Sequence, residues 1–281
     1  MTDPVTVPSA DTPAEEFLEV PGGRVHMFRA GEGEPLLFLH AAGGAGAWLD
    51  FHRMLAEGGY DVIAPDHPGF GKSDDFREVE AMDDLVYHYL DLLDALGLER
   101  AHVVGASFGG WIAAELAVAA PQRVGSLALL SAAGLRLPEH PVPDIFLMPP
   151  PRLLETLFHD PPPVPAAEPG ATPDIDTVLA AYRDTTALAR ICWTPYLNNP
   201  KLERRLHRIS APTLVVAPSD DRLIPVAHAQ RYAALIPGAR FAEVADCGHA
   251  MYFERPAEFA GVVLGFVARH GLPILPNGVS R

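Results

Sequence analysis

Short apolar runs alternate with helical patterns along most of the chain, and this alternation constrains the fold more than any other feature. Residues 36–39 are apolar at every position, which is typical of a strand covered on both faces. Strands that alternate with helices form a parallel, doubly wound sheet, so the sequence predicts an α/β fold. We expect strands at residues 17–20, 24–29, 36–39, 61–64, 101–104, 126–130, 213–217 and 240–244.

The segments between these strands have the spacing of helices. Met82, Leu85, Tyr89 and Leu92 recur every three or four residues, and Gly97 follows as at a helix C-terminus. We expect helices at residues 47–57, 82–96, 108–120, 226–235 and 256–269.

Residues 134–209 differ from the rest of the chain because they are rich in proline, with runs at 149–151 and 161–163. Aromatic and aliphatic residues are interleaved with the prolines, which is not the composition of a disordered linker. Helices are expected here at 152–158, 175–190 and 201–208. We interpret 134–209 as a small helical cap, which we call the cap below. It is inserted into an α/β core of residues 17–133 and 210–281, after a loose tail at 1–16.

The composition narrows the function classes. The formal net charge of −15 argues against nucleic acid or an anionic membrane as the main partner. No uncharged apolar stretch reaches membrane-spanning length, and the start of the chain has no signal-peptide pattern. Cys192 and Cys247 form no C-x-x-C pair and fit a reduced compartment. We therefore expect a soluble, cytoplasmic protein that acts on a small molecule without a cofactor or metal.

Residues 105–109 read Gly-Ala-Ser-Phe-Gly, match G-x-S-x-G and lie where a predicted strand becomes a predicted helix. A sharp strand-to-helix turn lifts a serine clear of the sheet, and the small residues around Ser107 leave room for such a turn. The N–H of Phe108 would then lie at a helix start, where it can stabilise an oxyanion. We expect Ser107 to be a nucleophile; the alternative is a plain serine in a tight turn.

A serine nucleophile needs a base and a group that orients the base. His249 directly follows the last predicted strand, so it is expected at the same sheet edge as Ser107. Asp220 and Asp221 follow the preceding strand, and either can orient the imidazole, whereas the stretch 131–134 offers no carboxylate. Along the chain these residues come in the order serine, acid, histidine, which is the order of the α/β-hydrolase triad. The small-residue loop 40–46 is expected to supply a second oxyanion donor, the N–H of Ala42.

Together these features resemble the α/β-hydrolase family, in its serine hydrolase branch with a helical cap (carboxylesterase-like), over about residues 17–270. Residues 66–74 are similar to the family loop D-x-P-G-x-G-x-S-D, and residues 248–256 to its G-H-x-x-x-x-E-x-P ending. Residues 221–225 are similar to its D-x-x-x-P acid loop, which favours Asp221 over Asp220.

The sequence departs from the family pattern at two positions. Ala41 follows His40 where the family usually has glycine, and alanine tolerates fewer backbone conformations. Pro218 stands where glycine is common, before the acid loop. The resemblance implies that His40 holds the oxyanion loop rather than reacts. Serine at the elbow argues against the haloalkane dehalogenase and epoxide hydrolase branches.

The leading expectation is a serine hydrolase that cleaves small to medium carboxylic esters through an acyl-enzyme. Alternatives are a carbon–carbon bond hydrolase of a vinylogous diketone acid, a cofactor-free perhydrolase and a catalytically silent receptor with a hydrolase fold. The carbon–carbon alternative requires a cation for the substrate carboxylate, for which the cap offers Arg152, Arg183 and Arg190. In the resemblance the cap covers the nucleophile, and the candidate substrate-binding residues are Phe146, Leu147, Met148, Phe158, Trp193 and Tyr196.

Overall fold

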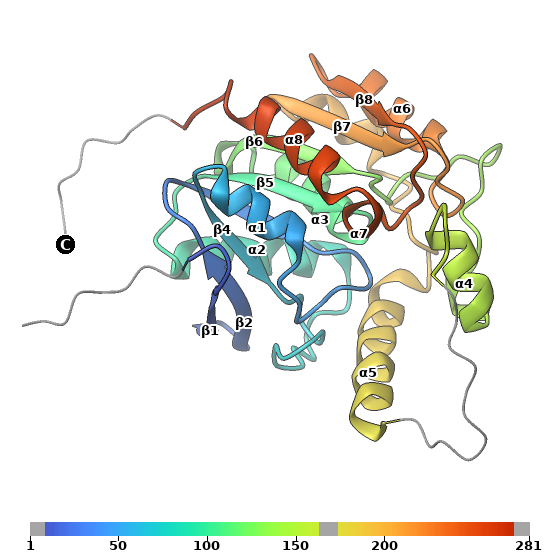
Figure 1. Cartoon of the computed structure of the whole chain (residues 1–281), viewed down its shortest axis with the longest axis horizontal. Coiled ribbons are helices and arrows are strands. Elements are labelled where there is room, and N and C mark those ends of the chain that lie inside the picture. Colours follow the sequence, from blue (N-terminus) through green and yellow to red (C-terminus); the bar gives the residue numbers. More distant parts are fainter. Residues whose placement is uncertain (1–8, 163–173, 273–281) are drawn as a thin grey trace, which may run out of the picture.

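The structure, a computed structural model, describes residues 9–162 and 174–272 (Figure 1). Within these residues eight strands form one sheet in the order β1-β2-β4-β3-β5-β6-β7-β8, which confirms the predicted α/β fold. The first eight residues of the expected tail, residues 163–173 of the cap and residues 273–281 lie outside the described residues. The strands are β1 (Ala14–Val20), β2 (Gly23–Ala30), β3 (Glu34–Leu39), β4 (Tyr60–Pro65), β5 (Ala101–Ala106), β6 (Val124–Leu130), β7 (Thr213–Pro218) and β8 (Arg240–Val244).

The sheet has an antiparallel edge and a parallel body. β1 pairs with β2, and β2 with β4, in the antiparallel direction, whereas β4, β3, β5, β6, β7 and β8 are parallel to one another. Every residue of β5 and β6 is buried, which explains why their sequences are almost entirely apolar or small. The carboxyl ends of the parallel strands meet at one edge, and the loops that follow them carry the candidate site.

Helices cover both faces of the sheet (Figure 1). One face carries α1 (Asp50–Glu57), the short α7 (Met251–Glu254) and α8 (Pro256–Val267), which contact one another. The other face carries α2 (Met82–Ala95), α3 (Phe108–Ala119) and α6 (Val226–Leu235). The sheet is therefore the middle layer of three.

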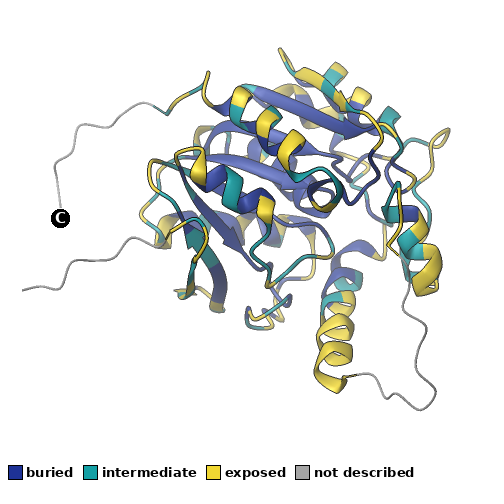
Figure 2. Ribbon diagram, in the orientation of Figure 1, coloured by how far each residue is buried: buried dark blue, intermediate teal, exposed yellow. Residues whose placement is uncertain are grey.

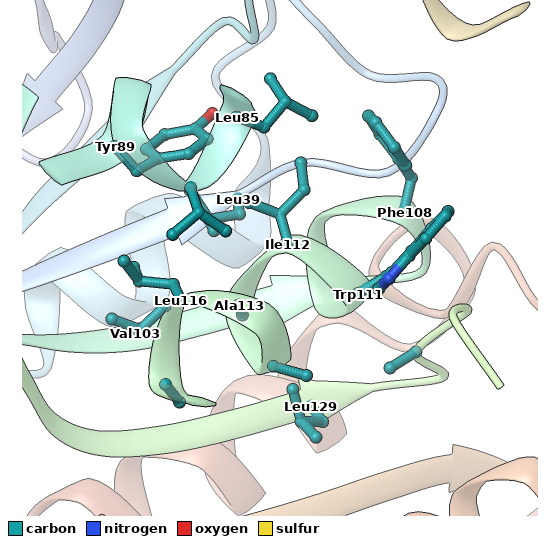
Figure 3. Packing of buried hydrophobic residues seen from close by; sticks show 14 of the residues in the cluster. Leu39, Leu85, Tyr89, Val103, Phe108, Trp111, Ile112, Ala113, Leu116 and Leu129 are labelled. Atoms are coloured by element: carbon teal, nitrogen blue, oxygen red, sulfur yellow. The ribbon is translucent and has the colours of Figure 1, made fainter. Parts of the chain in front are cut away.

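Two hydrophobic clusters fill the space between these layers. The larger contains residues of α2, α3 and α6, and Figure 3 shows Tyr89 of α2, Ile112 of α3 and the sheet residues Leu39, Val103 and Leu129 among its members. The smaller lies between the sheet and α1 and α8. Burying one such aliphatic or aromatic side chain contributes about 1.5–3 kcal/mol, so the clusters anchor β3, β5 and α3 firmly below the site.

The described residues between β6 and β7 include α4 (Pro150–Leu157), α5 (Ile175–Cys192) and two short 3₁₀ helices, η2 (Ile145–Leu147) and η3 (Glu203–Arg208). The prolines at 149–151 are compatible with the start of α4, because Pro150 occupies the first helical position, where the missing N–H is not needed. Figure 2 shows that the outer end of α5 is exposed.

Several elements differ from the sequence expectations, among them β1, α1 and residues 203–208. β1 begins at Ala14, inside the expected loose tail, because it pairs with β2 along its whole length. α1 begins at Asp50 rather than at residue 47. Residues 203–208 form a 3₁₀ helix rather than an α-helix.

The packing of α3 against β3 generates a stability prediction. A Cβ at Gly109 would lie 2.1 Å from the carbonyl oxygen of Leu39 and 2.5 Å from that of His40. Because the backbone of a central strand cannot yield, Gly109→Ala should lower the free energy of unfolding by about 3 kcal/mol. Urea denaturation measures this change.

Gly261→Ala is the matched control, since a Cβ at this exposed position in α8 would meet no atom within 4 Å. It should leave stability unchanged or raise it by up to about 1 kcal/mol, because alanine is the better helix former. Equal unfolding midpoints for the two variants would contradict the packing described here.

Candidate active site

Ser107 occupies the turn between β5 and α3 with a strained backbone. Its φ is +52°, in the left-handed region that residues with a side chain rarely adopt. The turn persists because its backbone is tied on both sides. The N–H of Ser107 donates to Leu130 O over 2.8 Å, and its carbonyl accepts from the N–H of Ala133 over 3.0 Å. The resulting turn exposes Oγ to a cavity above the sheet edge.

The structure brings Ser107, His249 and Asp221 together in one hydrogen-bonded row. Ser107 Oγ lies 2.8 Å from His249 Nε2, and His249 Nδ1 lies 2.8 Å from Asp221 Oδ2. All three side chains are buried. The ionised Asp221 can only accept, so Nδ1 carries the ring proton and Nε2 is free to take the proton of Ser107. This arrangement can activate a serine hydroxyl.

The two adjacent aspartates have different surroundings. Asp221 Oδ1 accepts the N–H groups of Leu223 and Ile224, over 2.9 and 2.7 Å, which fixes the carboxylate in the acid loop. Asp220 points elsewhere and pairs with Arg222 and His159 near the protein surface. The geometry therefore selects Asp221, as the motif favoured, and Pro218 does not displace it.

The sequence analysis missed one residue of this row. The Ser131 hydroxyl, at the end of β6, donates to Asp221 Oδ2, and its oxygen lies 3.4 Å from His249 Nδ1. The available signal was a polar residue directly after a buried apolar strand. Ser131 carries no carboxylate, so the requirement for an acid did not single it out.

The expected oxyanion donors border the same cavity. Ala42 and Phe108 both line it beside Ser107, and neither N–H is hydrogen-bonded to a protein group among the described residues. Free N–H groups next to a nucleophile can stabilise the charge that develops on a carbonyl oxygen. The loop 66–74 supports this region, because the Asp66 carboxylate accepts the N–H groups of Gly46 and Lys72.

The cavity above Ser107 has a volume of about 300 Å³ and a mainly apolar lining. Of the predicted cap residues, Phe146 and Phe158 line it. The further aliphatic and aromatic side chains in its wall are Ile145, Leu153, Leu157, Leu188, Leu197, Leu223, Tyr252 and Phe253. A cavity of this size and character suits a small, largely apolar ligand.

The other predicted substrate-binding residues do not line the cavity. Trp193 is 60% exposed and Leu147 is 78% exposed, at the surface of the cap. Tyr196 packs edge-on against Phe146, and its hydroxyl donates to Pro143 O. Met148 contacts Thr156 through its sulfur. These residues belong to the support or surface of the cap, which corrects the expectation that they contact substrate.

The cap arginines also lie outside the cavity. Arg152 is exposed and pairs with Glu155 within α4. Arg183 and Arg190 bind the loop after β4, where they donate to the carbonyl oxygens of Ser73 and Phe76 respectively. No lysine or arginine among residues 9–162 and 174–272 lines the cavity, so this part of the chain offers no permanently charged cation for a substrate carboxylate.

The described part of the chain holds no group of three or more His, Cys, Asp or Glu side chains placed to bind a metal ion. Its helices are all too short or too polar to cross a membrane.

Comparison with known proteins identifies the family. Residues 36–262 match the model of the alpha/beta hydrolase family, and the chain belongs to this family. The resemblance found in the motifs is thereby confirmed.

Three similar proteins have informative names. The chain is 33% identical to the 2-hydroxy-6-oxononadienedioate/2-hydroxy-6-oxononatrienedioate hydrolase of Paraburkholderia phymatum, over 96% of this chain and 100% of that protein. It is 31% identical to the 2-hydroxy-6-oxo-6-phenylhexa-2,4-dienoate hydrolase of Comamonas testosteroni, over 86% and 91% of the two chains. A solved structure of a bacterial membrane phospholipase A has a TM-score of 0.73 and 27% identity, covering 92% of this chain and 86% of that one.

The different surroundings of the two aspartates generate a prediction. Asp221→Asn should lower kcat by about 10⁴-fold, because the amide neither balances the imidazolium charge nor holds the productive tautomer. Asp220→Asn is the control, since its carboxylate lies outside the row, and its kcat should stay close to that of the unchanged protein. Comparable losses in the two variants would show that the row has been assigned wrongly.

Proposed function

We propose that this chain is a serine hydrolase that cleaves a carbon–carbon bond beside a ketone in a conjugated oxo-acid. The observation that carries the proposal is the row Ser107–His249–Asp221, found in a chain whose curated relatives are named as hydrolases of 2-hydroxy-6-oxo dienoates. Such compounds contain no ester or amide. Their hydrolysis therefore breaks the carbon–carbon bond next to the 6-oxo carbon.

The same row would perform both halves of this reaction. Ser107 Oγ adds to the oxo carbon while its proton moves to His249 Nε2, and Asp221 balances the imidazolium charge. The carbonyl oxygen becomes an oxyanion that accepts from the N–H groups of Ala42 and Phe108. In the 2-oxo tautomer of the substrate, which carries the enol proton on the carbon next to the 6-oxo group, the carbon–carbon bond then breaks, its electron pair is delocalised onto the 2-oxo oxygen, and His249 returns the proton to that oxygen. Water, deprotonated by His249, finally releases the acyl group from Ser107 as an acid.

The cavity favours a second candidate, the hydrolysis of an uncharged carboxylic ester. Burying a carboxylate without a paired cation is costly, and no lysine or arginine of the described residues lines the cavity. An ester of a small to medium apolar acid would meet no such cost. The same steps would apply with an alcohol as the leaving group. The name of the structural neighbour, a phospholipase A, also describes an ester hydrolase.

Steady-state kinetics on two substrate types tests the leading proposal. We expect the purified protein to hydrolyse 2-hydroxy-6-oxo-6-phenylhexa-2,4-dienoate, followed by the loss of its conjugated absorbance, with a higher kcat/KM than any 4-nitrophenyl ester. Ser107→Ala should abolish both activities, which excludes a contaminant. Turnover of the esters with the dienoate left intact would overturn the carbon–carbon proposal and support the second candidate.

The ester candidate makes its own prediction about chain length. Over the first few acyl carbons kcat/KM should rise, because each buried methylene adds up to about 0.8 kcal/mol. It should then fall, since the cavity of about 300 Å³ is filled and overpacking is unfavourable.

Phe146→Ala, which enlarges the cavity, should move this optimum to longer chains. Leu147→Ala alters its exposed neighbour and should not move it. A profile that rises steadily to long-chain esters would rule out an enclosed acyl site.

A further inference from the structure

Three buried side chains behind the oxyanion loop form a cluster that the reaction steps above do not use. His40 follows β3, His67 follows β4 and Tyr89 lies in α2, so the cluster joins three separate elements. His67 and Tyr89 are fully buried and His40 is nearly so. The rings of His40 and His67 lie against each other with centroids 3.7 Å apart. Polar atoms buried this deeply need partners, so their hydrogen bonds reveal their protonation.

The partners of His40 determine its tautomer. The backbone N–H of His67 lies 3.0 Å from His40 Nε2, and this N–H can only donate. Nε2 is therefore an acceptor without a proton. The ring proton of a neutral His40 is then on Nδ1, which donates to Ala41 O over 2.6 Å. The imidazole bridges the loop after β4 and the start of the oxyanion loop.

The partners of His67 are equally decisive. Nε2 lies 2.8 Å from the carbonyl oxygen of His40, which can only accept, so Nε2 carries the proton. Nδ1 is then the acceptor, and the hydroxyl of Tyr89 donates to it. Tyr89 thereby selects the tautomer in which His67 grips the backbone of His40. Burial favours the neutral forms on which these hydrogen bonds depend, because it lowers the pKa of both imidazoles and raises the pKa of the Tyr89 phenol.

His67 contacts both halves of the oxyanion site. Its hydrogen bond to His40 O holds the backbone two residues before Ala42. Its ring also packs edge-on against the ring of Phe108, with centroids 5.4 Å apart. In Figure 3 Tyr89 and Phe108 extend from neighbouring helices, α2 and α3, on the same side of the sheet. One side chain therefore touches the segments that carry both free N–H groups.

We propose that His67, held in one tautomer by Tyr89, is the positioning residue that sets the oxyanion N–H groups of Ala42 and Phe108 relative to Ser107. The inference rests on the proposed attack by Ser107. Alanine fits at position 41 because the φ of Ala41 is not positive, so the conformational freedom of glycine is not needed there. Fixed donors matter because a misplacement of about 1 Å can slow a reaction about a hundredfold.

The rate of reaction with a fluorophosphonate tests this role without knowledge of the substrate. Ser107 Oγ displaces fluoride from phosphorus, and the phosphoryl oxygen takes the place of the carbonyl oxygen in the oxyanion site. Intact-protein mass gives both the rate constant and the final number of labels per chain. His67→Gln should lower the rate constant about 10- to 100-fold with one label still bound at completion. Tyr89→Phe, which removes only the hydroxyl, should lower it about fivefold.

His102→Gln is the matched control. His102 is also fully buried with both ring nitrogens hydrogen-bonded, to Ser126 and Glu34, but it lies near the start of β5, at the opposite end of the strand from Ser107. Its labelling rate should equal that of the unchanged protein.

The outcomes separate this inference from the proposed function. The inference would be overturned if the variants of His67 and Tyr89 reacted at the rate of the unchanged protein. The same holds if they reacted at that rate but bound less than one label per chain, because that result would show a structural role only. If His67→Gln fails to fold, Tyr89→Phe alone decides. An unchanged protein that takes no label at all would overturn Ser107 as the nucleophile.

Discussion

The close approach of the first turn of α3 to the ends of β3 and β5 is the constraint on which the site depends. A Cβ at Gly105 would lie 2.3 Å from Gly109 O, and one at Gly109 would lie 2.1 Å from Leu39 O. Only hydrogen fits between these backbones. Because the helix can come so near, Ser107 is turned upward in its left-handed conformation, and the Phe108 N–H is left free beside it. The proposed chemistry of the site therefore depends on the glycines at positions 105 and 109, which leave room for this close approach.

Around this turn, each strand end contributes one part of the site. The loop after β3 supplies Ala42, the end of β6 supplies Ser131, the loop after β7 supplies Asp221 and the loop after β8 supplies His249. The convergence follows from the parallel sheet, whose carboxyl ends share one edge. The cap contributes apolar side chains, such as those of Phe146 and Phe158, to the wall of the cavity. The polar residues of the candidate site thus come from the strand ends, whereas the cap contributes to its apolar wall and supplies no lysine or arginine to that wall among the described residues.

The sequence predicted the hydrogen-bonded residues Ser107, His249 and Asp221 better than it predicted the residues that line the cavity. Ser107 and His249 follow from local rules, since a glycine-flanked turn and a residue after a buried strand have few possible placements. The choice of Asp221 over Asp220 needed the family motif, because two adjacent carboxylates differ only in where their loop points them. The cap residues could not be sorted from sequence. Phe146 and Trp193 are both aromatic, and only the packing of irregular, proline-rich turns decides that one faces the cavity and the other faces solvent. The partners of His67 were hidden for the same reason, since they come from three distant segments.

The proposed reaction passes through a covalent intermediate at Ser107, and mass spectrometry of acid-quenched reactions observes this intermediate directly. During turnover of a substrate, or of a slow 4-nitrophenyl ester, the peptide containing Ser107 should gain the mass of the acyl group, and tandem fragmentation should place it on that serine. His249→Ala should show no accumulation, because the serine is no longer activated. An acyl group found on another residue, or turnover with no adduct in rapidly quenched samples, would contradict the nucleophilic role of Ser107.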